Sequence, residues 1–210
     1  MANRDGKRKS REELSKRRTP LLGYYLIATD AKETEVNYLT GLKDSIPAEH
    51  KSKITIRVID KVKPTELVKT VLEKASEHAQ YAEPWIVFDR DRVPNFDAII
   101  REAEDKGVKV GWSNPCIEIW FYAYYGDMPS YTESTSCVSG FRQQFQRKTK
   151  LEYEKSKKDI YRKLVDTGDE KKAIELAKMR LRHGEDKKPS EMYSTTTLHE
   201  LIEEIRNKTK

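Results

Sequence analysis

The sequence predicts an α/β fold in which a parallel sheet of about four strands is flanked by helices and followed by a helical C-terminal extension. Three observations lead to this prediction. In residues 21–126, four short β-rich runs alternate with helical patterns, as in parallel βαβ units with helices on both sheet faces. Residues 127–210 contain only helical patterns and polar connections. The length of 210 residues suits one domain with a small appended part.

The elements of the first half follow from local patterns. Compact runs of β-branched and aromatic residues predict strands at 23–29, 54–60, 85–89 and 108–112. Helical spacing of apolar residues predicts helices at 33–46, 64–80, 95–107 and 115–126. Boundary residues support the third of these helices, with Asn95 as its N-cap and Gly107 at its end.

The second half is predicted to pack on this core as an extension. A polar segment at 127–140 is expected to be a loop, and helical patterns follow at 141–165, 169–182 and 195–208. We therefore divide the chain into a basic N-terminal arm at 1–20, an α/β domain at 21–126 and an extension at 127–210. Neither a phosphate-binding loop nor a dinucleotide fingerprint occurs in the sequence.

Composition narrows the classes of protein. No apolar run approaches the roughly 20 residues that span a bilayer, and the N-terminus has no apolar signal-peptide core. We therefore expect a cytoplasmic protein without a membrane partner. The two cysteines, Cys116 and Cys137, do not have zinc-site spacing and are expected to be reduced thiols.

Charge is unevenly distributed along the chain. Residues 1–20 contain eight Lys or Arg and three Asp or Glu, and residues 141–188 contain sixteen and nine. The rest of the chain is acidic. This distribution is expected if carboxylates bind cations while other surfaces contact phosphates. Ordinary solvated helix faces explain residues 141–188 equally well.

Acidic residues follow the predicted strands. Asp30 ends the first strand, with Glu35 close behind, Asp89 and Asp91 end the third strand, and Glu118 follows the fourth. Ligands of parallel sheets bind beyond the carboxyl ends of the strands, so we expect these acids to share one edge. The alternative for Glu35 is a first-turn acid that interacts with the helix dipole. The alternative for Glu118, which lies in an apolar stretch, is a buried charge paired with Arg90 or Arg92.

The pair Asp89 and Asp91 predicts a metal site. In extended backbone two residues at this spacing point the same way, and their repulsion would raise a carboxylate pKa. A divalent cation removes the conflict, and carboxylate oxygens with waters suit Mg²⁺ or Mn²⁺ rather than Zn²⁺. An isolated Asp-x-Asp is also common on protein surfaces. The position of this one after a third βαβ strand favours the metal site.

Several stretches together resemble the RloB family. They are "YYLIATDAKETEVNYLTGL", "VFDRD" with "NF", "VGWSNPCIEIWF", "YEKSKKDIYRKL" and "STTTLHELIEEI". The resemblance covers nearly the whole chain from about residue 21. It implies a Toprim-like domain, the metal-dependent fold shared with primases, topoisomerases and nucleases of the OLD type. It also implies a place in bacterial restriction or phage-defence loci, often beside an ATPase partner.

The resemblance also implies roles for individual residues. Asp89 and Asp91 match the Asp-x-Asp that holds Mg²⁺, Glu35 matches the acid of Thr-Glu, and Glu118 matches the Glu after Asn-Pro-Cys. Asp30 stands where the family has its acid after the first strand. The family has Glu-Gly where this chain has Asp30-Ala31. Aspartate is one methylene shorter, about 1.5 Å, and alanine does not easily adopt a positive φ, so catalysis at this site is in question.

Together these features predict a Mg²⁺- or Mn²⁺-dependent nuclease that cleaves phosphodiesters in anti-phage defence. Asp30, Asp89 and Asp91 would hold the metal, with Glu35 and Glu118 completing the catalytic set. Arg90, Arg92 and Lys155 are expected to contact the nucleic acid, although Lys155 fits a solvated face equally well. The alternative is a catalytically attenuated module of the same fold that binds nucleic acid or a partner. DNA and RNA substrates, an ABC-like ATPase partner and a homo-oligomer are all compatible with the sequence.

Overall fold

The structure is a computed structural model of the chain, and it describes residues 22–77, 82–91 and 93–210. The predicted basic arm at 1–20 and the candidate residue Arg92 lie outside the described residues. Among the described residues, no helix is both long and apolar enough to cross a bilayer.

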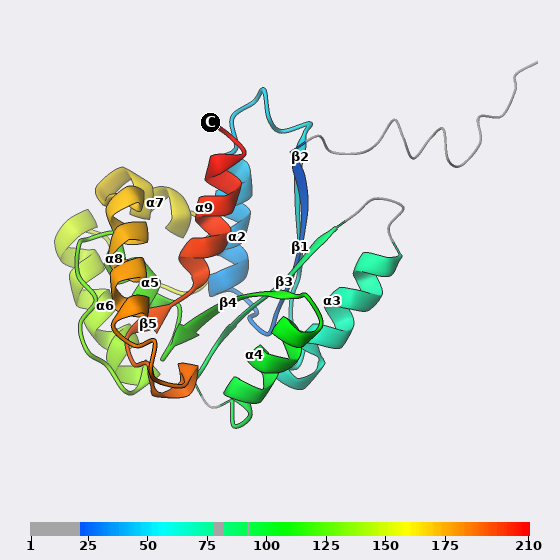
Figure 1. Cartoon of the computed structure of the whole chain (residues 1–210). Coiled ribbons are helices and arrows are strands. Elements are labelled where there is room, and N and C mark those ends of the chain that lie inside the picture. Colours follow the sequence, from blue (N-terminus) through cyan, green and yellow to red (C-terminus); the bar gives the residue numbers. More distant parts are fainter. Residues whose placement is uncertain (1–21, 78–81, 92) are drawn as a thin grey trace, which may run out of the picture.

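A mostly parallel sheet of five strands forms the centre of the molecule (Figure 1). Its strands are β1 (Gly23–Thr29), β2 (Ile54–Ile59), β3 (Glu83–Asp89), β4 (Lys109–Asn114) and β5 (Thr195–Thr196). Their order in the sheet is β2-β1-β3-β4-β5, and β1 to β4 are parallel. The predicted α/β fold is therefore confirmed, and the arrangement is consistent with a Toprim-like fold.

The fifth strand corrects the prediction of a helix from residue 195. β5 pairs antiparallel with β4, and the helix begins only at Leu198. Consecutive threonines explain the difference, because their hydroxyls bond to β4. Thr197 Oγ1 donates to the Val110 carbonyl and accepts from the Trp112 N–H, each at 2.9 Å. A strand of two residues is too short to show an alternating pattern.

Helices alternate with the strands and then continue alone. In the first half they are α2 (Thr34–Asp44), α3 (Leu67–Ser76) with a 3₁₀ turn, η1 (Pro64–Glu66), before it, α4 (Phe96–Asp105) and α5 (Glu118–Ala123). In the second half they are α6 (Ser134–Thr149), α7 (Ile160–Thr167), α8 (Glu170–Arg182) and α9 (Leu198–Asn207), with a second 3₁₀ turn, η2 (Pro189–Glu191), between α8 and β5.

Two predicted boundaries in the second half were wrong. The expected loop at 127–140 ends early, because α6 already begins at Ser134 and buries Cys137 and Phe141 one turn apart. The expected helix at 141–165 is interrupted between α6 and α7. Lys150 ends α6 in the left-handed conformation, with φ of 63°. The interruption places Tyr153, which is 2% exposed, in an irregular segment.

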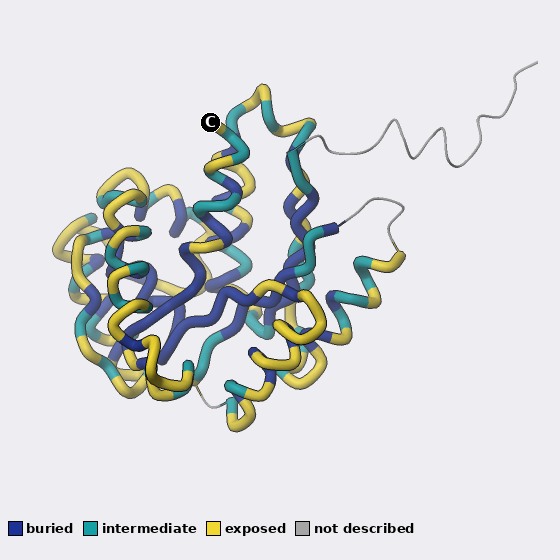
Figure 2. The backbone as a smooth tube through the Cα atoms, viewed as in Figure 1, coloured by how far each residue is buried: buried dark blue, intermediate teal, exposed yellow. Residues whose placement is uncertain are grey.

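The sheet separates two apolar cores because its side chains alternate between the faces. Tyr25 and Ile27 of β1 belong to the core beneath α2 and α5–α9, whereas Leu26 and Ala28 belong to the core beneath α3 and α4. Figure 2 shows the central strands buried between these helices, whose outer sides are exposed, whereas the edge strand β2 is only partly buried.

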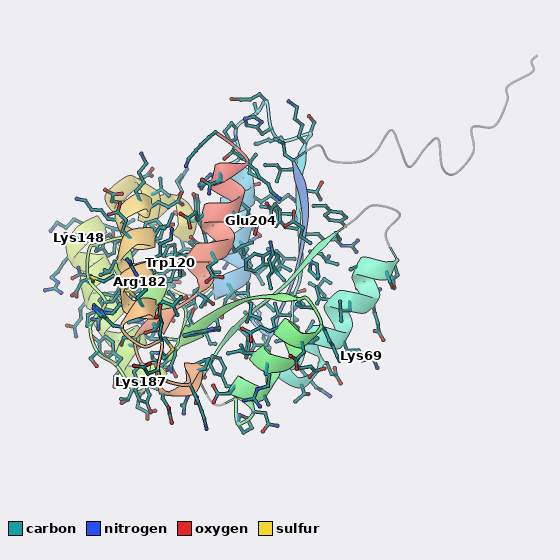
Figure 3. All side chains as sticks on the ribbon, viewed as in Figure 1. Lys69, Trp120, Lys148, Arg182, Lys187 and Glu204 are labelled. Carbon is teal, nitrogen blue, oxygen red and sulfur yellow. The ribbon has the colours of Figure 1, made fainter. Side chains whose placement is uncertain are left out.

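The helices of the second half thus cover the same sheet face as α2. α7 packs against α2, α8 against α5, and α9 against β4. Figure 3 shows Trp120 of α5 inside this layer, with Lys148 and Arg182 on its outer side. Gly111 leaves room for the close approach of α9 to the sheet, since a Cβ there would make tight contacts of 3.2 Å with Leu198 Cδ1 and 3.3 Å with Val87 Cγ2.

Candidate functional site

The candidate acids gather at the carboxyl edge of the parallel strands, as predicted from the strand ends. Asp30 follows β1, Asp89 is the last residue of β3, and Glu118 is the first residue of α5. Glu35 lies in the first turn of α2. The charges of Asp30, Glu118 and Glu35 all act on Asp89, so four elements place their carboxylates within electrostatic reach of one another.

Glu35 is buried, with 7% of its surface exposed. Burial, with smaller contributions from the charges of Asp30 and Glu118, raises its pKa to about 7, although hydrogen bonds to the Glu35 backbone and to Asp89 act to lower it. A helix-dipole role at the protein surface does not describe this residue. Glu33, which precedes α2 and is exposed, fits that simpler description.

The pKa values of Asp30 and Asp89 are also raised above the ordinary value of an aspartate. Burial, with a smaller contribution from the charge of Asp91, raises the pKa of Asp30 to about 6. Burial and then the charges of Glu35, Glu118 and Asp30 raise the pKa of Asp89 well above its ordinary value. A hydrogen bond acts to lower the pKa of Asp89, since its Oδ2 accepts from the Ile117 N–H at 3.0 Å. The N-terminal turn of α5 thereby orients Asp89.

Asp91 is placed differently from the expectation. The chain leaves the extended conformation after Asp89, and Asp91 has φ of 20°. Its N–H donates to the Pro115 carbonyl at 3.0 Å, and its carboxylate accepts from the Ser134 hydroxyl of α6. The argument that Asp89 and Asp91 point the same way along a strand therefore does not hold. Asp91 is exposed and stands at the rim of the cluster.

Glu118 is the most deeply buried acid of the cluster, with no exposed surface. Its Oε1 accepts a hydrogen bond from the Tyr153 hydroxyl at 2.9 Å and lies 3.5 Å from Lys155 Nζ. Its Oε2 is buried without a hydrogen-bond partner. A buried carboxylate oxygen without a partner costs free energy, and a cation bound there would offset that cost.

Lys155 brings a positive charge to these acids from the segment between α6 and α7. Burial acts to lower the pKa of Lys155. The charge of Glu118 outweighs this effect, with smaller contributions from Cys116, Asp89 and Glu35, so the net shift of the pKa is upward. The backbone of the segment is fixed as well, because Asn37 of α2 donates to the Lys155 carbonyl at 3.3 Å.

Arg90, the other described candidate for nucleic-acid contact, directly follows Asp89 and lies apart from Lys155 in a separate hollow. It lines a hollow of about 330 Å³ together with Asp91, Val93, Pro94, Phe96, Asp97 and Ser190. Its side chain donates only to the neighbouring Asp91 carbonyl, at 3.4 Å, among the contacts of the described residues. The alternative of an ion pair between Glu118 and Arg90 is not seen among the described residues, where the cation beside Glu118 is Lys155.

The donor set of this edge fits a hard divalent cation. The described residues contain no group of three His, Cys, Asp or Glu side chains close enough to hold an ion directly. Mg²⁺ often uses only one or two carboxylates together with waters. The type and number of donors here are therefore sufficient for Mg²⁺, since Asp89 and Glu35 repel each other and Glu118 Oε2 has no hydrogen-bond partner. The oxygen-only set gives no reason to expect zinc.

The backbone conformation of Ala31 shows that the replacement of the family's glycine at this residue does not strain the turn. Among the described residues, the non-glycine residues with positive φ are Lys61, Asp91, Lys150 and Ser194. Ala31 is not one of them, and its N–H donates to the Thr29 hydroxyl at 3.2 Å. The turn after β1 therefore does not require glycine at this residue.

Sequence reasoning missed three residues that shape the site, namely Asn37, Ser134 and Tyr153. Tyr153 had a signal, because it precedes Lys155 by two residues and is a large aromatic in an otherwise charged stretch. Ser134 and Asn37 had none, since their contacts with Asp91 and Lys155 join segments far apart in the sequence.

Comparison with known proteins identifies the family. The sequence model described as "RloB-like protein" matches residues 25–205, which is most of the chain. A search of curated proteins and a search of solved structures each found no match. The match includes β2 to β5, β1 from Tyr25 onward and all the acids described above. The chain therefore belongs to the RloB-like protein family.

Proposed function

We propose that this protein is a Mg²⁺- or Mn²⁺-dependent nuclease of the Toprim-like type, which cleaves nucleic-acid phosphodiesters in the bacterial cytoplasm as part of anti-phage defence. The observation that carries the proposal is the convergence of Asp30, Glu35, Asp89 and Glu118 into one charge-coupled cluster at the carboxyl edge of the sheet. Repelling buried carboxylates weaken a fold, and perturbed groups of this kind concentrate at functional sites.

The residues of the cluster would divide the work by position. Asp89, oriented by the Ile117 N–H, and Asp30 would hold the ion, with Asp91 at the rim and Glu118, held by the Tyr153 hydroxyl, completing the set. A bound divalent cation supplies charge shielding at the phosphate and lowers the pKa of water. Glu35, whose pKa of about 7 lies near the working pH, is suited to accept the proton of the attacking water.

Basic residues on both sides would hold the phosphate backbone without reading its sequence. Lys155 lies on the α2 and α5 side of the acids, and Arg90 lies in the hollow on the α4 side. We extend the same role to Arg92 and the basic arm from the sequence alone. An ABC-like ATPase and a homo-oligomeric state belong to the proposal only through the family resemblance.

The test compares acids of the cluster with an exposed acid at the same edge of the sheet. Asp89→Asn and Glu118→Gln should each weaken Mg²⁺ binding in calorimetry and lower cleavage of DNA, RNA or tRNA by on the order of 100-fold. Asp60→Asn, at an exposed position directly after β2, is the matched control and should behave like the native protein. Native cleavage by both the Asp89→Asn and the Glu118→Gln variant would contradict the assignment.

One observation favours a second candidate, a nucleic-acid- or partner-binding module with attenuated catalysis. Asp30 is one methylene shorter than the glutamate of the family pattern, and misplacement of a reacting group by about 1 Å can cost 10²-fold in rate. Calorimetric Mg²⁺ binding without Mn²⁺-supported cleavage of any of the three substrates would favour this module. An Asp30→Glu variant that gains cleavage would identify the shorter side chain as the cause.

A further inference from the structure

The ammonium of Lys155 neutralises the Glu118 carboxylate and would repel a divalent cation bound at the same carboxylate. Lys155 Nζ lies 3.5 Å from Glu118 Oε1, which also accepts the Tyr153 hydrogen bond at 2.9 Å. Two cations placed at one carboxylate repel each other, and the repulsion is strong where water is excluded. Glu118 is fully buried, so an ammonium at this position disfavours an ion at the same carboxylate.

The Lys155 side chain can leave Glu118, although its backbone cannot. Its carbonyl is held by Asn37 of α2, and Tyr153, two residues earlier, is anchored in the core. The side chain itself is 48% exposed. A lysine head on a flexible stem from a fixed backbone can turn from a carboxylate to a nearby phosphate.

No other described Lys or Arg shares this placement. Within residues 22–77, 82–91 and 93–210, the ion pairs include no second cation joined to Asp30, Glu35, Asp89 or Glu118. Lys157, from the same segment, instead pairs with Glu154 at 3.1 Å on the surface. Lys155 and Lys157 thus differ in role, because Lys155 pairs with an acid of the cluster and Lys157 pairs only with a surface acid.

We propose that Lys155 couples nucleic-acid binding to divalent-cation binding. In the free protein the Lys155 ammonium neutralises Glu118 and competes with the cation. A substrate phosphate draws the ammonium away, and Glu118, still held by Tyr153, becomes available to the ion. Each ligand then raises the affinity for the other by the same factor, as linkage requires. The inference rests on the proposed function, since it assumes that these acids bind the cation.

Calorimetric Mg²⁺ titrations of the full chain, with and without nucleic acid, test the coupling. Phosphorothioate single-stranded DNA and RNA, which resist cleavage, serve as probes. Without nucleic acid, Lys155→Met should bind Mg²⁺ at least about 5-fold more tightly than the native protein, the lower end of typical coupling. With either probe the native protein should gain a similar factor, and Lys155→Met should gain almost none.

Two further variants separate the coupling from charge and folding effects. Lys157→Met removes the same charge from the same segment and should bind Mg²⁺ like the native protein. Lys155→Arg keeps the charge and should retain the coupling. Equal or weaker Mg²⁺ binding by Lys155→Met, or no gain by the native protein with either probe, would overturn the inference. Failure of the proposed function looks different, because Asp89→Asn would then leave Mg²⁺ binding unchanged.

Discussion

At the scale of single residues, the candidate site is held together against electrostatic repulsion. Glu35, Asp89 and Glu118 are brought near one another in the interior, and each negative charge raises the pKa of Glu35 or Asp89. The compensating contacts are few. They include the Ile117 N–H on Asp89 and the Tyr153 hydroxyl on Glu118. Without a bound cation, the charged form of this cluster should therefore destabilise the folded protein.

The pH dependence of stability tests that expectation. Burial raises the pKa of Glu35 from 4.5 to about 7, so the folded state holds this proton more tightly than the unfolded state. The free energy of unfolding should then fall as pH rises from about 4.5 to about 7, by on the order of 3 kcal/mol for this residue. Urea unfolding in the presence of a chelator measures the change.

Matched variants of the same turn identify the group that titrates. Glu35→Gln should remove much of the pH dependence and stabilise the metal-free protein near pH 8. Glu33→Gln, which changes an exposed acid two residues earlier, should leave the pH profile as it is in the native protein. The same pH slope in the native protein and in Glu35→Gln would show that Glu35 is not the titrating group.

The sequence predicted the acids of the site better than their surroundings. Strand ends were sufficient to bring Asp30, Asp89 and Glu118 to one edge, because a parallel sheet places its carboxyl ends together. Two features escaped prediction. The turn at Asp91 depends on contacts with Pro115 and Ser134, and the partner of Glu118 comes from 35 positions further along the chain. Such contacts leave no local pattern.

At the scale of secondary structure, elements with long apolar periodicity were predicted and short ones were missed. The strands β1 to β4 and the helices α2 to α4 lie close to their predicted positions, because buried side chains recur along them. β5 consists of two threonines, and the break after Lys150 depends on a single left-handed residue. Neither carries a periodic signal. The break is nevertheless what brings Tyr153 and Lys155 to the acids.

The contact between α2 and α7 allows helix propensity and packing to be compared. Alanine in a helix interior is more favourable than glycine by about 1 kcal/mol, so Gly41→Ala would stabilise an isolated α2. A Cβ at Gly41, however, would lie 2.5 Å from the Tyr161 Cβ of α7, an atom fixed to its backbone. Overpacking typically costs 1–3 kcal/mol.

We expect packing to prevail, so that Gly41→Ala lowers the free energy of unfolding by up to roughly 2 kcal/mol, the difference of these two terms. Chemical denaturation measures it. Thr40→Ala, at the exposed neighbouring position of α2, is the control and should have a small effect. A more stable Gly41→Ala protein would mean that α2 and α7 do not pack this closely.

At the scale of the whole molecule, the second half completes a core that the sheet begins. One apolar cluster contains Tyr25 and Ile27 of β1, Trp120 of α5, Phe141 of α6 and Leu201 of α9. The division at residue 126 remains a prediction about chain organisation. The shared core implies that the two parts do not fold independently, and the same packing delivers Tyr153 and Lys155 to the site.

Truncation tests this interdependence. Ending the chain after Thr197 removes α9, whose Leu198, Leu201, Ile202 and Ile205 are fully buried. Burying four such side chains contributes about 6–12 kcal/mol, which is comparable with the whole stability of a typical domain, about 5–15 kcal/mol. We therefore expect this truncated chain, and one ending at residue 126, to lose cooperative thermal unfolding in circular dichroism. Removing only Thr209 and Lys210, beyond the end of α9, should leave the transition in place. A cooperative transition in the chain ending at 126 would instead show that residues 21–126 fold alone, and that α9 covers a core already stable without it.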